Sequence, residues 1–278
     1  MRFNQVSCVE DLVTAMDGKA KKHDALHYFT RLSVLDSIVK KQAWQFNNSS
    51  GMNDLHELIK NFCLDSKTNE AIQRKRERLY YSCFSFGDED NVAMWSLYGI
   101  PWEDAVCITL KKDSITSLLN SMDKYSNDNN AETFFHDMCY IEGKMGADDQ
   151  LLHWYDCRNR NLAKNDRLFA QNIELVGYLK NSCWRYENES RFGFVLNQPN
   201  EQGYVKIPLE KDFWKNITIT LGPKNIHPIE EIRLMLNQAS SEITSDIDIR
   251  ESYFLKYDFF RNLKRHCDKC KYNFQYNE

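Results

Sequence analysis

Short aromatic segments with strand-like alternation are mixed irregularly with helical patterns along this chain of 278 residues. Aromatic or β-branched runs bounded by polar residues predict strands at residues 26–30, 44–46, 80–86, 105–110, 185–196, 217–221 and 247–256. Helical periodicity predicts helices at residues 32–41, 55–79, 91–99, 161–180 and 228–237. Because the two kinds of element do not alternate regularly, the pattern favours an α+β fold over a doubly wound sheet.

Composition and charge exclude several classes of protein. Hydrophobic residues make up 42% of the chain and the net charge is -4, so a packed core is expected and a strongly basic nucleic-acid coat protein is not. No apolar run approaches the roughly 18 residues of a membrane helix, and residues 1–13 lack a signal pattern. We therefore expect a cytoplasmic protein with no membrane partner.

A single domain is expected over residues 1–278, with its core at about residues 26–235 and a C-terminal extension at 236–278. Polar stretches rich in turn-forming residues are expected to be the least ordered; they lie at residues 121–130, 197–203 and 237–246.

The nine cysteines are scattered and are expected to be reduced. His266 precedes a C-x-x-C pair at Cys267 and Cys270, but a structural zinc needs a second ligand pair at matching spacing. No metal site is predicted.

The segment at residues 80–86 carries side chains suited to a planar ligand. Two-residue periodicity puts Tyr81, Cys83 and Ser85 on one face, and an aromatic face bearing hydroxyls can bind a ring by stacking. The same alternation is also typical of an aromatic core strand. His27, on the strand before the first helix, has the same two interpretations, because its ring either enters a cleft or is structural.

Two carboxylates lie close together in the segment at residues 185–196. On a strand, Glu187, Glu189 and Arg191 share a face, where the carboxylates repel each other unless Arg191 pairs with one or both face a functional cleft. An exposed ion-paired edge is the structural alternative. The basic run at residues 73–78 is likewise either a solvated helix face or a phosphate-binding patch.

Six short motifs occur in an order that resembles a bacterial domain-of-unknown-function family. They are His27-Tyr28, Asn53-Asp54 with Glu57, Cys83-Phe84-Ser85, Met94-Trp95-Ser96 with Tyr98, Glu187/Glu189/Arg191 and Leu221-Gly222-Pro223. The layout in turn looks like the ADP-ribosyltransferase fold, whose members hold NAD in a cleft of a split β-sheet surrounded by helices. There the first strand carries a His or Arg, a middle strand aromatic and hydroxyl residues, and a late strand the catalytic Glu, often as E-x-E. The chain departs from that pattern in having no Ser-Thr-Ser triplet.

The resemblance implies roles for individual residues. Glu189 would be the main catalytic carboxylate and Glu187 would position or deprotonate the acceptor. The residues implied to bind NAD, which is a substrate here, are His27, Tyr28, Thr30, Tyr81, Ser85, Tyr98 and Arg191. The ring that stacks on nicotinamide remains open among Tyr80, Tyr81 and Tyr98.

The resemblance predicts an NAD-dependent ADP-ribosyltransferase that modifies a macromolecule, as a toxin or an effector of anti-phage defence. Nucleic acid, RNA or single-stranded DNA, is slightly favoured over protein as the acceptor, because residues 26–44 resemble the opening of nucleic-acid-modifying members. A toxin would need an antitoxin partner. The alternatives are a non-catalytic nucleotide- or partner-binding module and an NAD glycohydrolase.

Overall fold

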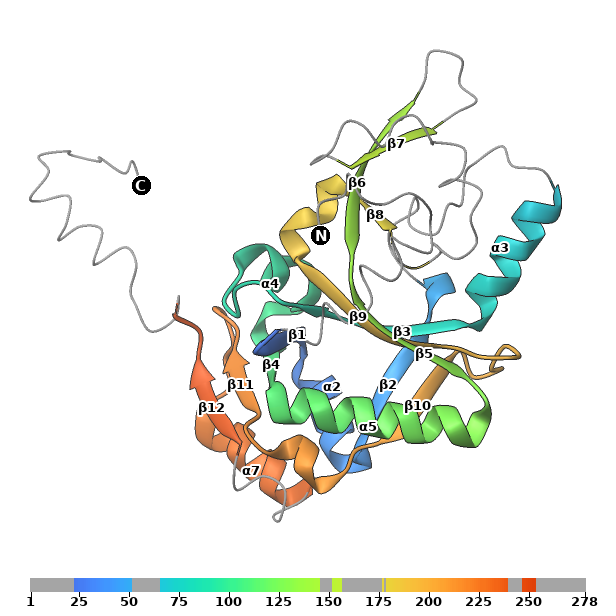
Figure 1. Ribbon diagram of the computed structural model, residues 1–278. Coiled ribbons are helices and arrows are strands. Elements are labelled where there is room, and N and C mark those ends of the chain that lie inside the picture. The colour runs from blue at the N-terminus through green and yellow to red at the C-terminus, as the bar shows by residue number, and fades with distance from the viewer. Residues whose placement is uncertain are drawn as a thin grey trace, which may run out of the picture.

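A mixed β-sheet of nine strands forms the centre of the computed structural model, which describes residues 23–51, 66–145, 152–156, 177, 179–239 and 247–253 (Figure 1). The strands are β1 Ala25–Arg31, β2 Ala43–Asn48, β3 Leu79–Ser85, β4 Ala105–Lys111, β5 Glu132–Asp137, β9 Glu189–Val195, β10 Tyr204–Pro208, β11 Thr218–Leu221 and β12 Asp248–Glu251. Their order is β10-β2-β3-β1-β4-β11-β12, and β9 pairs with both β3 and β5.

A second sheet has three strands, β6 Cys139–Met145, β7 Leu152–Asp156 and β8 Leu179–Asn181. The α-helices are α2 Leu32–Lys41, α3 Ser66–Arg78, α4 Val92–Tyr98, α5 Lys112–Asn129 and α7 Ile229–Ala239, and the 3-10 helices are η3 Ser49–Gly51, η4 Trp102–Asp104, η7 Ser182–Glu187 and η8 Lys211–Trp214. The predicted α+β class is therefore confirmed. No helix in the described ranges is long and apolar enough to cross a membrane.

Strand alternation separates two buried layers. On β1, Leu26 belongs to the main core, which also buries the apolar sides of α2, α5 and α7. Phe29 points to the other side of the sheet, where it packs edge-on against Trp95 of α4 with ring centroids 4.9 Å apart. Because successive side chains of a strand face opposite ways, β1 carries one face into each layer. Figure 1 shows α2, α5 and α7 together below the sheet and α4 above it.

The main sheet opens along one edge of β3. The start of β3 pairs with β2 through Tyr80 and Tyr81, whereas its end pairs with β1 through Ser85 and His27. β1 and β2, joined by α2, therefore diverge from a common edge. Residues 82–84 of β3 lie between the two pairings, and β9 covers the opposite edge of β3 over its whole length.

Several predicted elements occur close to their expected positions. The helix expected at residues 32–41 is α2, which buries Leu35, Ile38 and Val39 at helical spacing. The short helix expected at residues 91–99 is α4, and the Oδ1 atom of Asn91 caps it by accepting from the backbone N–H groups of Ala93 and Met94. The helical prediction at residues 55–79 is confirmed for α3, and residues 55–65 lie outside the described residues.

Other predictions were wrong. Residues 121–130 were expected to be poorly ordered, but residues 121–129 form the second half of α5 and Asn130 is its C-cap. Met122 is buried there and Tyr125 packs against Phe194. The strand expected at residues 185–196 begins only at Glu189, after the 3-10 helix η7 and Asn188, whose φ is 44°. Asparagine tolerates this left-handed conformation, so the chain turns sharply there and Glu187 does not lie on the strand.

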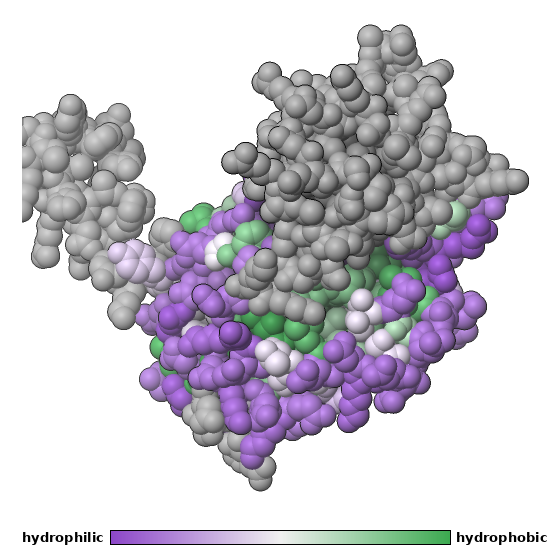
Figure 2. Space-filling model, viewed as in Figure 1, coloured by the Kyte–Doolittle hydropathy of each residue, from purple (hydrophilic) through white to green (hydrophobic). Residues whose placement is uncertain are grey.

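The expected C-terminal limit of the core also changes. β12 pairs in parallel with β11, so the sheet extends beyond residue 235 to Glu251. Residues 179–181 form strand β8 rather than the end of the helix expected at residues 161–180, and most of that range lies outside the described residues. Figure 2 shows the face seen in Figure 1, with hydrophobic residues gathered at its middle and hydrophilic residues around them.

Candidate active site

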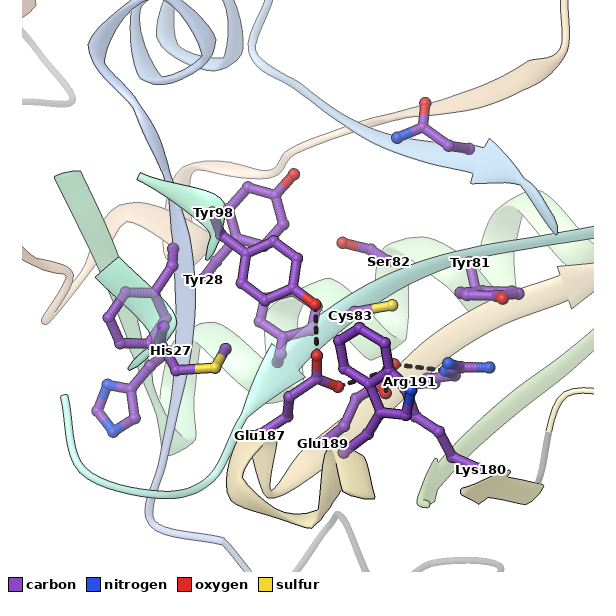
Figure 3. A pocket seen from close by; sticks show the side chains of 15 residues that line it. His27, Tyr28, Tyr81, Ser82, Cys83, Tyr98, Lys180, Glu187, Glu189 and Arg191 are labelled. Carbon is purple, nitrogen blue, oxygen red and sulfur yellow. Dashed lines mark hydrogen bonds and ion pairs between the residues drawn. The ribbon is translucent and has the colours of Figure 1, made fainter. Parts of the chain in front are cut away.

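A cavity of about 230 Å³ occupies the opening between β1, β2 and β3. Ser82, Cys83 and Phe84 line it from the unpaired middle of that edge of β3, and His27 and Tyr28 line it from β1. Its other walls come from α4, β8, η7 and β9. The cavity thus collects residues from segments more than 150 positions apart in the sequence (Figure 3).

A buried ionic cluster forms one wall of the cavity. The Nζ atom of Lys180 donates to Oε2 of Glu187 and, at 2.8 Å, to Oε2 of Glu189. The Nε atom of Arg191 donates to Oε1 of Glu189 at 2.5 Å, and the hydroxyl of Tyr98 donates to Oε1 of Glu187. Glu187 and Glu189 are 2% and 3% exposed, so these contacts replace most of the water that would solvate the two carboxylates.

The two carboxylates have different electrostatic environments. Burial raises the pKa of Glu187 above its ordinary value, although Lys180 and the Tyr98 hydroxyl oppose this rise. Burial also favours the neutral form of Glu189, but Arg191 and Lys180 outweigh it, so the pKa of Glu189 falls far below its usual range. When the pKa values of two neighbouring carboxyl groups are shifted in opposite directions, one group can exchange a proton while the other stays charged.

His27 is neutral at neutral pH. Its Nδ1 atom lies 3.0 Å from Oγ1 of Thr109 on β4, and burial lowers the pKa of the ring to about 4, with Asp88 and Arg250 making smaller, opposing contributions. Figure 3 shows the ring on the opposite side of the cavity from Glu187 and Glu189. A neutral imidazole at this position is suited to hydrogen bonding rather than to charge stabilisation.

The three tyrosines left open by the sequence differ in what they contact. Tyr80 is in the core, and its hydroxyl accepts from the backbone N–H of Asn200 at 2.7 Å. Tyr81 lines the cavity but is 1% exposed, and the guanidinium of Arg191 covers its ring at 4.2 Å. Tyr98 lines the cavity and is 38% exposed, so it is the tyrosine with free ring surface.

The structure brings most predicted site residues together. His27, Tyr28, Tyr81, Tyr98, Glu187, Glu189 and Arg191 all line the cavity. Thr30 and Ser85 do not: Thr30 lies on the core-facing side of β1, and the Ser85 hydroxyl accepts from the backbone N–H of Gly87 at 3.1 Å. Asn53, Asp54, Glu57 and the C-x-x-C pair at Cys267 and Cys270 lie outside the described residues.

Sequence reasoning missed Lys180, Trp184 and Asn47, which also line the cavity. Lys180 lies over the Trp184 ring, 5.0 Å from its centroid. Lys180 precedes the E-x-E-x-R motif by seven residues in a segment that was predicted to be helical, so no local pattern marked it. Trp184 lies one residue before the strand predicted at residues 185–196, and no role was predicted for it.

Comparisons of the chain with protein-family models, with curated proteins and with solved structures give no match.

Proposed function

We propose that the protein is an NAD-dependent ADP-ribosyltransferase with its active site in this cavity. The observation that carries the proposal is the meeting of Glu187, Glu189 and His27 around one opening in the sheet. It depends on three adjacent strands, in the order β1-β3-β9. The His strand, the aromatic strand and the E-x-E segment are the three elements that the resemblance to ADP-ribosyltransferases requires, and the opening between β1 and β2 along β3 agrees with a split sheet.

The size of the cavity suits one end of the dinucleotide. At about 230 Å³ it is smaller than the roughly 300–1,000 Å³ of pockets that enclose drug-sized ligands. We place nicotinamide and its ribose inside it and leave the adenosine end outside. Tyr98 would stack on the nicotinamide ring with its free face, and neutral His27 would hydrogen-bond a ribose hydroxyl.

The proposed reaction breaks the bond between nicotinamide and ribose. The bonding electron pair leaves with nicotinamide, which neutralises the positive ring, and the ribose gains oxocarbenium character. Glu189, kept ionised by Arg191 and Lys180, stabilises this developing positive charge. The acceptor then bonds to the ribose carbon and passes its proton to Glu187. Arg191 is fully buried and orients Glu189 without reaching the substrate.

A basic groove at the junction of α3 and β3 supports a nucleic-acid acceptor. It has a volume of about 320 Å³ and is lined by Arg74, Lys75 and Arg78 of α3 together with Glu132 and Asn197. The side chain of Arg74 is 64% exposed. α3 runs directly into β3, so the groove lies about 10 Å along the chain from Tyr81 in the cavity wall. In a chain of net charge -4, this local cluster of cations is suited to phosphate contacts.

The test is to incubate the protein with NAD labelled in its ADP-ribose part, together with single-stranded RNA, single-stranded DNA, duplex DNA and total cell protein. Label should enter the single strands fastest, because they present an unstacked base at the lowest cost. The R74E/R78E variant should lose this preference. A plot of the logarithm of its affinity for single strands against the logarithm of salt concentration should be shallower by about 1.4, because two phosphate contacts are lost. The K111E/K112E variant, which reverses two exposed cations, should label like the parent.

The same assay separates the alternatives. Label on protein alone would assign a protein acceptor and reject the groove as the acceptor site. Free ADP-ribose with no labelled macromolecule would identify an NAD glycohydrolase. NAD binding without release of nicotinamide would identify a non-catalytic binding module. Labelling that harms the producing cell would support a toxin or anti-phage effector, and would predict an antitoxin partner.

A further inference from the structure

Lys180 is the least expected member of the cavity wall. It lies on β8, in the small sheet, yet its side chain is 6% exposed and its Nζ atom reaches carboxylates on both η7 and β9. A buried ammonium is costly unless it is paired. Here it is paired twice, so a single cation from the small sheet joins the candidate catalytic carboxylates of η7 and of β9 in the main sheet.

The contacts of the two carboxylates are unequal. Glu189 receives two cationic donors, Lys180 and Arg191. Glu187 shares the same Lys180, but the donor on its other oxygen is the neutral hydroxyl of Tyr98. Lys180 is therefore the charged donor of Glu187 in the described structure, whereas Glu189 has a second one.

We propose that Lys180 is a positioning residue that bridges Glu187 and Glu189 and makes Glu187 the carboxyl group that exchanges a proton during the reaction. This inference rests on the proposed function and adds to it the residue that sets the protonation of the pair. Arg191 holds Glu189 ionised with or without Lys180. Glu187 depends on Lys180 for its charged form, so its protonation responds to what happens to this one ammonium group.

The proton has a defined destination in the proposed step. When the acceptor O–H or N–H bonds to the ribose carbon, its proton moves to the Glu187 carboxylate, and nicotinamide leaves with the electron pair of the broken bond. The Tyr98 hydroxyl donates to the same carboxyl group. After the products leave, Glu187 returns the proton to water.

Other ionisable groups lie around Glu187 and also influence its protonation. Those that act on Glu187 directly are Lys180 on β8, Glu189 on β9, Tyr98 on α4, Tyr140 on β6 and Tyr186 on η7. Arg191 on β9 and Cys83 on β3 act on Glu189, and Cys183 on η7 acts on Tyr186. Of these, Lys180 and Arg191 are the cations, and Arg191 is hydrogen-bonded to Glu189. The bridge from Lys180 is therefore the contact whose removal should act most on Glu187.

The experiment follows the protonation of Glu187 by infrared difference spectroscopy during a pH titration of the protein without substrate, with E187Q identifying the band. An opposite charge at this range lowers a carboxyl pKa by about 1–3 units. The K180M variant should therefore raise the Glu187 midpoint by that amount and shift the acidic limb of the rate profile equally. K180R should restore the parent midpoint. K206M is the matched control, since Lys206 also lies over an aromatic ring, that of Tyr204, and it should change nothing.

A merely structural Lys180 would give a different result: K180M would lower the melting temperature and leave the Glu187 midpoint unchanged, and this would overturn the proposal. If K180M does not fold, K180Q carries the test, because glutamine keeps a polar group at this position but removes the charge, so the Glu187 midpoint should again rise. A K180Q midpoint equal to that of the parent would overturn the proposal. If the midpoints move as expected but the parent releases no nicotinamide, the bridge stands and the transferase function fails.

Discussion

Lowering the pH should destabilise the protein because His27 is buried in its neutral form. The pKa of this ring is about 4 in the folded protein against 6.5 in the unfolded chain. The unfolded state therefore binds a proton as the pH falls through 6.5, while the folded state does not until about 4. The loss of unfolding free energy attributable to His27 is about 2 kcal/mol between pH 7 and pH 5, and about 3 kcal/mol once the pH is below 4.

The assay is urea unfolding at pH 5, 6 and 7, followed by tryptophan fluorescence, for the parent and for H27Q. Glutamine keeps a polar group that can bond Thr109 but does not titrate, so the pH dependence of H27Q should be smaller by about 2 kcal/mol. His136, whose pKa burial lowers to about 3, acts in the same direction in both proteins. His227 acts oppositely, because its hydrogen bond to Asp104 raises its pKa. Equal pH dependence in parent and variant would refute the placement of His27 as a buried neutral ring.

Three further predictions concern other parts of the structure. The E189Q variant should lose about 10²–10³-fold in turnover. It should also melt roughly 10 °C lower, because breaking a buried ion pair costs about 3–5 kcal/mol; an unchanged melting temperature in calorimetry would contradict the buried cluster. G193A should lose about 1–3 kcal/mol in urea unfolding, because a Cβ there would lie 2.5 Å from the Tyr80 carbonyl oxygen; a neutral result would argue against the packing of β9 on β3. In alkylation followed by mass spectrometry, exposed Cys183 should react before Cys83 and Cys107, because burial raises the pKa of both of these thiols; equal rates would contradict this order.

Much of the fold could be predicted because local periodicity and burial agree. In α2, the apolar spacing of Leu35, Ile38 and Val39 is the same spacing that the main core buries. The error at α5 shows the limit of reading composition alone. Its polar second half carries Met122 and Tyr125 at helical spacing from Ile115 and Leu118. This periodicity indicates a helix, but the prediction of poor order was based on the abundance of Ser, Asn and Asp.

The candidate site was predictable where a motif and a strand face coincide, as for Glu189 and Arg191. Glu187 reaches the same cavity for a different reason, because the turn at Asn188 redirects the chain and Lys180 joins its carboxylate to Glu189. Lys180 itself was beyond local reasoning, since its role arises from β8 packing beside η7 and β9. Thr30 shares the alternation of its strand with Leu26 and Tyr28, but the cavity lies beside residues 27–29 of β1 and does not reach Thr30. The sequence alone does not show how far along the strand the cavity extends.

The central claim is that the cavity beside Glu187 and Glu189 cleaves NAD. The most direct measurement is nicotinamide release from NAD by the purified protein, compared with E189Q and with E230Q, which removes an exposed carboxylate on α7. We predict release by the parent and by E230Q, and a loss of about 10²–10³-fold in E189Q. Equal release by the parent and a folded E189Q, or no release by the parent with acceptor present, would contradict the account.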